Sequence, residues 1–281
     1  MFEKILVPLD GSDFSWAALD QAMELAEDVK SEIHLLYVVD ERLIEAPFVI
    51  ATYPEDLLPE VHPEFVEMAL QLQKKLQEQG EQILAQAEAR CQERNLPCVK
   101  ELAEGNVPRI ILDRAKEVDL VVMGRQGAGA KWGGPMLGSA FEAVVRHSPV
   151  PVLGVQRQAR PIYRILVAYD GSQRAEDALD IAIELAQRGR EIVLLTVDDG
   201  HKDRVEAYDK ARMKLIEADV VFTAIFREGH VADVILNVAQ ETDCDLIAMG
   251  AYGHRRFLSI FFGSTVDEVM RHTTLPILIC R

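Results

Sequence analysis

The chain has 281 residues, of which 49% are hydrophobic and 27% charged, a composition that excludes a disordered or membrane-spanning protein and suits two domains of roughly 140 residues each. Acidic residues outnumber basic ones by 46 to 30, which gives a net charge of -16. This charge argues against a general affinity for nucleic acid or for an anionic membrane, so an anionic ligand would need a local site.

The first half predicts strands that alternate with helices. Residues 5–9 form a short apolar run that ends in Asp10-Gly11-Ser12, and apolar positions then recur at helical spacing up to residue 26. A second apolar run at residues 33–39 lacks strict alternation, which is typical of a parallel strand covered on both faces. Further strands are predicted at residues 99–102, 120–123 and 150–155.

Residues 41–92 contain a substantial insertion relative to the second half. Four prolines predict an irregular segment over residues 45–63, and an apolar stripe that starts at Phe65 predicts a long amphipathic helix. Gly80 lies within this stripe, where a glycine can kink a helix. In the second half one shorter helix takes the same place in the order of elements.

The second half repeats the first at an offset of 160 residues. The sequence Ile-Leu-Val-Pro-Leu-Asp-Gly-Ser starts at Ile5, and Ile-Leu-Val-Ala-Tyr-Asp-Gly-Ser starts at Ile165. The same order of strands and helices follows each copy, which predicts two related domains, residues 1–156 and 161–281. Strands that alternate with helices imply parallel pairing and right-handed crossovers, and therefore two doubly wound α/β domains.

Each half closes with a strand that begins beside a proline, Pro151 in the first half and Pro276 in the second. Proline cannot donate to a central ladder, so these closing strands are expected at a sheet edge. An edge strand is a natural surface for pairing, and we expect the two domains to pair through these last strands. The sequence leaves a homodimer open and identifies no regulatory protein partner.

A glycine-rich segment follows the fourth strand of the second half. It runs from Gly250 through Gly253 to Gly263, Ser264 and Thr265, and a helix is predicted directly after it. Glycine permits tight turns and lets backbone amides approach a ligand. Unpaired amides and the dipole at a helix N-terminus favour an anion, above all a phosphate. The segment is therefore a candidate phosphate site.

Asp170 is expected to face the same site. It follows the first strand of its half, and in an open α/β sheet ligands bind beyond the carboxyl ends of the strands where the strand order reverses. A second interpretation needs no ligand, because Thr265 followed three residues later by Glu268 fits a capping box. The combination of glycines, helix start and aspartate favours the phosphate site.

The pattern Gly-x2-Gly-x9-Gly-[Ser/Thr] after a fourth strand, together with the repeated Ile-Leu-Val-x-x-Asp-Gly-Ser, resembles the universal stress protein family in its tandem, two-domain form. The resemblance covers nearly the whole chain apart from the insertion. It implies Rossmann-like domains of the adenine nucleotide alpha hydrolase-like type, with strand order 3-2-1-4-5, and a crevice that holds ATP, with Mg bound through the phosphates. The implied ligand contacts in the second domain are Ala168, Asp170, Val197, Met249, Gly250, Gly253, Gly263, Ser264 and Thr265.

The first half departs from this pattern. Ten residues rather than nine separate Gly127 from Gly138, and the intervening segment contains the bulky Trp132. The extra residue shifts every amide relative to a phosphate, although the glycines between them can absorb the shift. Whether the first domain binds nucleotide is therefore left open. The positions that would line its site are Asp10, Val38, Gly124, Gly127, Gly138 and Ser139.

Sequence signatures of catalysis are absent from both halves. Neither contains the Gly-x4-Gly-Lys-[Ser/Thr] of a P-loop or the Gly-x-Ser-x-Gly of a nucleophile elbow, and no carboxylate cluster marks a metal site. The matched pairs Arg146-His147 and Arg271-His272 end the last helix of each half, which favours compensation of the helix dipole over catalysis. We expect a regulatory ATP-binding module of the stress response, without catalytic or metal-binding residues. The alternatives are a slow ATP hydrolase and an interaction scaffold without nucleotide.

The sequence also predicts a cytoplasmic location. The four cysteines, Cys91, Cys98, Cys244 and Cys280, are scattered without Cys-x-x-Cys spacing, which favours plain reduced thiols. No apolar run approaches the roughly 20 residues needed to cross a bilayer, and no signal-type segment precedes the strand at residues 5–9.

Overall fold

The computed structural model describes residues 2–43, 63–128, 136–198, 200, 203–251 and 264–281. The strands are β1 (Lys4–Leu9), β2 (Glu32–Asp40), β3 (Cys98–Gly105), β4 (Leu120–Gly124), β5 (Val152–Val155), β6 (Arg164–Ala168), β7 (Glu191–Asp198), β8 (Phe222–Glu228), β9 (Leu246–Gly250) and β10 (Ile277–Cys280). The helices of the first half are α1 (Asp13–Glu27), α3 (Pro63–Glu93), α4 (Val107–Arg114) with the short 3₁₀ helix Ala115–Glu117 after it, and α5 (Ser139–His147). Those of the second half are α6 (Gln173–Ala186), α7 (Arg204–Glu217), α8 (Val231–Glu241) and α9 (Ser264–His272).

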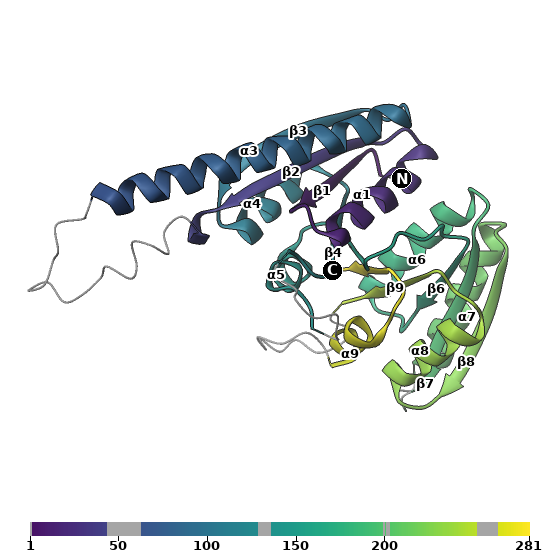
Figure 1. The fold of residues 1–281 in the computed structure, drawn as a ribbon. Coiled ribbons are helices and arrows are strands. Elements are labelled where there is room, and N and C mark those ends of the chain that lie inside the picture. Colours follow the sequence, from purple (N-terminus) through teal and green to yellow (C-terminus); the bar gives the residue numbers. More distant parts are fainter. Residues whose placement is uncertain (1, 44–62, 129–135, 199, 201–202, 252–263) are drawn as a thin grey trace, which may run out of the picture.

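Within the described residues, ten strands form one continuous sheet in the order β3-β2-β1-β4-β5-β10-β9-β6-β7-β8 (Figure 1). Each half has the order 3-2-1-4-5, so the predicted pair of doubly wound α/β domains is confirmed. Strands pair in parallel within each half, whereas β5 and β10 pair antiparallel, with Leu153 opposite Leu278. Because β5 and β10 are antiparallel, the strands of the two halves run in opposite directions. The carboxyl ends of the first-half strands therefore lie on the side of the sheet where the second-half strands have their amino ends.

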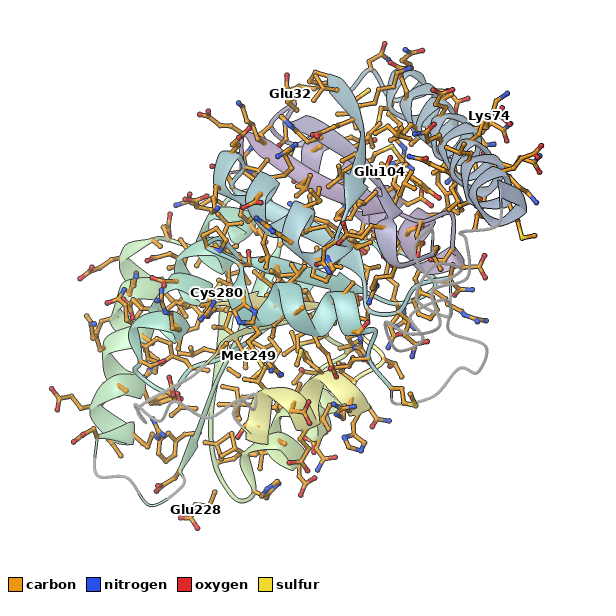
Figure 2. The ribbon with its side chains drawn as sticks, turned by 90° about the vertical axis from the view of Figure 1, so that its left-hand side faces the viewer. Glu32, Lys74, Glu104, Glu228, Met249 and Cys280 are labelled. Carbon is orange, nitrogen blue, oxygen red and sulfur yellow. The ribbon has the colours of Figure 1, made fainter. Side chains whose placement is uncertain are left out.

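Helices cover both faces of this sheet. Buried apolar residues of α1, α3, α6 and α7 form one cluster with the strands, and those of α4, α5, α8 and α9 form a second cluster on the other face. Each cluster contains residues of both halves, so each core layer continues across the joint. Figure 2 shows Met249 and Cys280 in the interior and Lys74 and Glu228 at the periphery. Among the described helices, none combines the length and apolar character of a transmembrane segment.

The insertion contributes α3, a helix of 31 residues that packs on β2 and β3 and extends beyond their ends (Figure 1). It continues through Gly80 without interruption. Packing explains this glycine, because a Cβ atom at position 80 would lie 2.5 Å from Tyr37 Cδ1 and 2.6 Å from Leu102 Cδ1. Gly80 therefore lets α3 lie directly against the sheet.

Ion pairs link the two halves on both faces. The buried Arg190 donates to Asp28 Oδ2 (2.6 Å) and to Glu24 Oε1 (3.2 Å), the carboxylates of α1 and its C-cap. Burial raises the pKa of Glu24, and the charge of Arg190 opposes that rise. On the other face Arg271 of α9 donates to Glu142 Oε1 of α5 (3.0 Å). The joint is thus supported by charged contacts as well as by the sheet.

The packing of Gly80 can be tested by Gly80→Ala. Alanine favours a helix over glycine by about 1 kcal/mol, but the added Cβ would overlap the buried Tyr37 ring, and such overpacking costs roughly 1–3 kcal/mol. We expect a net loss of about 1 kcal/mol in the free energy of unfolding, measured by urea denaturation. The exposed neighbour Gln79→Ala should leave that free energy unchanged or slightly raised. A stabilised Gly80→Ala chain would contradict this account.

Candidate functional site

The loop after the first strand is built in the same way in both halves. In the first half, Asp10 Oδ1 accepts a hydrogen bond from the Ser12 amide (2.9 Å), and the Ser12 hydroxyl accepts one from the Ser15 amide at the start of α1 (3.2 Å). Gly11 between them has a φ of 78°, in the left-handed region that favours glycine. The second half repeats these contacts from Asp170 to Ala175. Local backbone geometry therefore explains why Asp-Gly-Ser occurs twice.

The predicted site residues of the second half that the structure describes lie at the carboxyl ends of neighbouring strands. Ala168 ends β6 and is opposite Met249 in the pairing of β6 with β9. Asp170 follows two residues later, Val197 is the next-to-last residue of β7, and Gly250 ends β9. The fold therefore brings these five together. Outside the described residues lie Gly253 and Gly263.

The first half gathers the matching residues at its own carboxyl edge. Asp10 follows β1, Val38 lies near the end of β2, and Gly124 ends β4. Asp10 makes a second contact here, because its Oδ2 accepts a hydrogen bond from the Ala128 amide (2.8 Å). A Cβ at Gly127 would lie 2.7 Å from the same oxygen, so glycine lets the carboxylate reach this loop. Both carboxylate oxygens of Asp10 therefore accept hydrogen bonds from backbone amides.

Asp170 takes the corresponding place in the second half, where the Ser172 amide donates to its carboxylate (2.9 Å). The residues that correspond to Gly127 and Ala128 lie outside the described residues. Beside the carboxylate, Nη1 of Arg204, the first residue of α7, donates to the backbone carbonyl of Asp170. The second half thus presents a carboxylate at its crevice with a guanidinium next to it.

Arg204 was not identified from the sequence. The glycines of the two Asp-Gly-Ser loops, Gly11 and Gly171, pack on α3 and α7 and show which positions of these helices correspond. A Cβ at Gly11 would lie 2.8 Å from Ile83 Cδ1, and a Cβ at Gly171 would lie 2.8 Å from Ala207 Cβ. Three residues earlier stand Gly80 and Arg204. The position that packs closely on the sheet in one half therefore carries a cation in the other. Because α3 and α7 differ in length, the sequence alone does not align them.

Gly124 and Gly250 are packing residues. A Cβ at Gly124 would lie 2.7 Å from Phe14 Cβ of α1, and one at Gly250 would lie 2.6 Å from the Ala175 amide nitrogen of α6. Neither glycine has a positive φ, so the tight turn expected at Gly250 is not its reason. Both let the first helix of each half approach the fourth strand, with or without a ligand.

Gly138 has a different environment. It is the N-cap residue of α5, and no side chain caps the amides of that helix, which begins at Ser139. Its φ is -72°, and the nearest atoms to a Cβ there would be 3.4 Å away. Neither the backbone nor packing requires glycine at this position. A bare N-cap leaves the first amides of the helix accessible to an anion.

The matching helix α9 begins at Ser264, with Thr265 as its second residue. A capping box would place the threonine at the N-cap, before the first helical residue, whereas Thr265 lies within α9. Glu268 instead forms an ion pair with His230, with 3.8 Å between its Oε2 and Nε2 of the imidazole. The first turn of α9 thus contains Ser264 and Thr265, the two residues of this helix that were predicted to contact a phosphate.

The matched histidines lie at the last turns of α5 and α9. His147 Nδ1 is 3.0 Å from the Ala143 carbonyl oxygen, and His272 Nδ1 is 2.8 Å from the Glu268 carbonyl oxygen. Each contact supplies a partner to a carbonyl near a helix end. These contacts agree with the helix-end role expected from the sequence.

Two described cavities lie away from both crevices. One of about 230 Å³ is lined by Arg164, Glu191 and Phe222, and one of about 210 Å³ by His34 and Lys100 among others. Both are near the amino ends of the strands. They therefore belong to neither set of predicted site residues.

Comparisons with known proteins agree with this architecture. A sequence model of the universal stress protein family matches residues 1–156, 162–218 and 198–281. The chain is 26% identical over 286 residues to the universal stress protein Slr1230 of Synechocystis, covering 99% of this chain and 100% of that protein. It is 26% identical over 308 residues to the universal stress protein Rv1996 of Mycobacterium tuberculosis, covering 99% and 94%. A solved universal stress protein from Archaeoglobus fulgidus matches with a TM-score of 0.75 and 22% identity, covering 99% of this chain and 98% of that one, and it shares the fold.

Two glycines of the first half should respond differently to the same substitution. In Gly127→Ser the new Cβ would displace the Asp10 carboxylate from the Ala128 amide, which we expect to cost about 1–2 kcal/mol in the free energy of unfolding. Gly138→Ser adds a favoured N-cap residue where there is room, so the change should stay within about 0.5 kcal/mol. Urea denaturation of both variants checks this order, and equal losses would refute it.

Proposed function

Because the chain belongs to the universal stress protein family and places a carboxylate and a guanidinium side by side at the crevice of its second half, we propose that it is a regulatory module that binds ATP. One observation carries this proposal. Asp170 lies at the crevice of the second half with the guanidinium of Arg204 beside it, at a helix position that carries Gly80 in the first half. A ribose hydroxyl is a suitable donor for the Asp170 carboxylate.

The neighbouring residues suit the other parts of a nucleotide. The half-buried Ala168 lines the place proposed for the adenine together with the end of β9 at Met249, and Val197, which is buried, offers its backbone at the adenine edge. The N-terminus of α9, with Ser264 and Thr265, supplies amides and a favourable dipole for phosphates. Any Mg²⁺ is expected to bind through the phosphates themselves.

Arg204 supplies positive charge to this crevice. The whole chain carries a net charge of -16, so a local cation matters for the binding of a polyanion. Its bond to the Asp170 carbonyl fixes the guanidinium beside the carboxylate proposed to contact the ribose. Arginine is suited to phosphate recognition because it presents several donors in a planar fork.

The proposal assigns the tighter site to the second domain. At the helix position that carries Arg204 in the second domain the first domain has Gly80, and a ribose at the Asp10 carboxylate would have to displace the Ala128 amide. The bare N-cap at Gly138 still offers an anion site there. We therefore expect the first domain to bind nucleotide more weakly than the second.

The role we propose is regulatory, within a cytoplasmic stress response. Neither half has a P-loop or a nucleophile elbow, so no residue is assigned to catalysis. Bound ATP would act by favouring one conformation or partner surface over another. The four free cysteines suit a reducing compartment.

Two alternatives can be separated from this proposal. Mass spectrometry of the small molecules released on denaturation, with titration of the stripped chain by ATP, distinguishes a nucleotide binder from an empty scaffold. Phosphate release from Mg-ATP, compared with buffer alone, distinguishes a binder from a slow hydrolase. No released nucleotide together with no ATP affinity would favour the scaffold.

The two aspartates should contribute unequally to ATP binding. Loss of a hydrogen bond to a charged group costs about 1.5–3 kcal/mol, so Asp170→Ala should weaken the tighter ATP site by about tenfold or more. Asp10→Ala should mainly lower the free energy of unfolding, because it removes the bond to Ala128. Calorimetric titration and urea denaturation of both variants measure these effects. The reverse order of ATP affinities would assign the site to the first domain.

Arg204→Ala should also weaken ATP binding, by about tenfold, because the crevice loses a cation near the polyanion. Arg212→Ala is the matched control, since this arginine lies on the same helix and pairs with Asp209 at the surface (3.6 Å). Both variants remove one positive charge from the chain, so a difference in their ATP affinities would report the position of Arg204 and not the net charge. Equal ATP affinities for the two variants would remove Arg204 from the site.

A further inference from the structure

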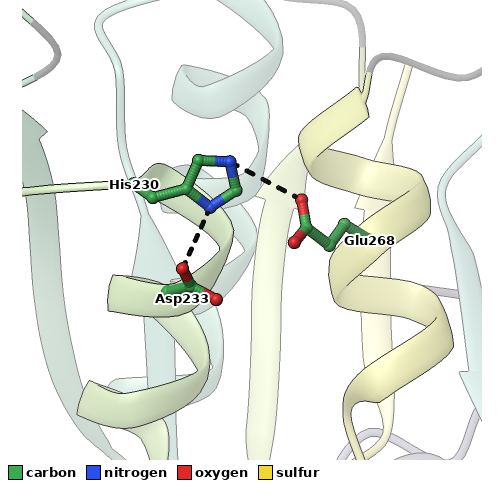
Figure 3. Close-up of side chains that lie close together, drawn as sticks. All are labelled: His230, Asp233 and Glu268. Carbon is green, nitrogen blue, oxygen red and sulfur yellow. Dashed lines mark ion pairs between the residues drawn. The ribbon is translucent and has the colours of Figure 1, made fainter.

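Three side chains with metal-binding atoms meet at the surface of the second half (Figure 3). His230 is the N-cap residue of α8, Asp233 lies in the first turn of that helix, and Glu268 lies on the neighbouring α9. His230 Nδ1 is 3.3 Å from Asp233 Oδ2, and His230 Nε2 is 3.8 Å from Glu268 Oε2. One ligand atom of each residue lies within 4.8 Å of the other two. In the described part of the chain no other group of this kind was found.

The fold accounts for this meeting. The helix α8 starts where β8 ends and α9 starts beyond the end of β9, so both helices begin at the same edge of the sheet. The two helices pack against each other on one face. Their first turns are therefore neighbours, although His230 and Glu268 are far apart in the sequence. Figure 3 shows the imidazole between the two carboxylates.

The first half provides an internal comparison with the same backbone. The glycine before α4 in the first half and the one before α8 in the second have nearly the same φ, 144° and 142°, and the N-cap residues that follow have φ values of -72° and -71°. The helices α5 and α9 have nine residues each and both end in Arg-His. The residues that correspond to His230, Asp233 and Glu268 are Asn106, Arg109 and Ala143. Neither the turn nor the helix packing therefore requires the His-Asp-Glu set.

We propose that His230, Asp233 and Glu268 form a binding site for a divalent transition-metal ion, of which Zn²⁺ is the representative. One imidazole nitrogen and two carboxylate oxygens are a donor set that suits Zn²⁺, whereas Mg²⁺ and Ca²⁺ prefer oxygen ligands alone. The two carboxylates balance the charge of the ion and outweigh the opposing dipole at the start of α8. A fourth coordination position stays open to water.

The ligand atoms have to approach one another to bind the ion. Zn²⁺ holds nitrogen and oxygen ligands at about 2.0–2.2 Å, so the atoms around it must be closer together than 4.8 Å. The side chains of His230 and Asp233 are 62% and 67% exposed, which leaves them room to turn, and that of Glu268 is 35% exposed. The two carboxylates face different nitrogens of the imidazole, so binding of one ion requires that at least one of these exposed side chains rotate.

A metal at this site would tie the start of α8 to α9. The first residues of α9 are the proposed phosphate contacts, so the ion would steady the helix that holds them. The site itself needs no nucleotide, and its test is carried out without one. Failure of ATP binding would therefore leave the metal proposal standing, and the reverse also holds.

The experiment is a calorimetric titration of the chelator-treated full chain with Zn²⁺, in the absence of nucleotide. We expect one equivalent of Zn²⁺ per chain at this site, and a loss of affinity of at least about tenfold in His230→Ala and in Glu268→Gln. His147→Ala is the matched control, because it removes an exposed histidine from the corresponding helix α5, where it contacts none of the proposed ligands, and should leave the affinity unchanged. Urea denaturation without metal verifies that each variant is folded.

A second measurement excludes binding by cysteine. Co²⁺ in place of Zn²⁺ should give a spectrum without thiolate-to-metal bands, since the proposed ligands are nitrogen and oxygen. Three of the four cysteines are buried in any case. Unchanged Zn²⁺ affinity in His230→Ala and Glu268→Gln, or no stoichiometric binding by the native chain, would overturn the proposal and leave the three residues as an ion-pair bridge.

Discussion

The antiparallel pairing of β5 with β10 is the interaction on which the rest of the structure depends. Each closing strand has four residues and would be an exposed edge in an isolated domain, open to pairing with another chain. Their union converts two five-stranded sheets into one and lets both core layers run across the joint. It also reverses the strand direction between the halves, so the two crevices open at opposite edges. Fusion thus keeps the halves rigidly connected while it separates their sites.

Within this frame the two halves use one backbone for different side-chain chemistry. The Asp-Gly-Ser loop is the same in both, down to the hydrogen bonds at 2.9 Å. The helix that packs beside this loop carries Gly80 in one half and Arg204 in the other. The insertion lengthens this helix in the first half, and the strand order stays the same in both halves.

The fold was predictable from the sequence because its signals are local. Apolar runs, the repeated Asp-Gly-Ser and the prolines beside the closing strands each concern a few consecutive residues, and together they predicted two doubly wound α/β domains. The strand order itself was implied by the resemblance to the universal stress protein family. The reasons for individual glycines were not predictable. Gly80 and Gly250 are required by side chains or helices from distant parts of the chain, and a sequence pattern does not reveal such contacts. The same limit concealed Arg204 and the group around His230, whose members meet only through tertiary packing.

The helix α9 connects the two crevices physically. Its first residues are the proposed phosphate contacts of the second half, and near its last turn Arg271 bonds to Glu142 in the first turn of α5. The helix α5 in turn starts at Gly138, beside the loop that holds Asp10. A ligand-dependent displacement of α9 along its axis would therefore act on the ion pair with Glu142, and through it on the start of α5. Such coupling requires that the ligand bind two positions of α9 with different affinity. The continuous core on that face opposes large movements, so only small displacements of α9 are compatible with the packing.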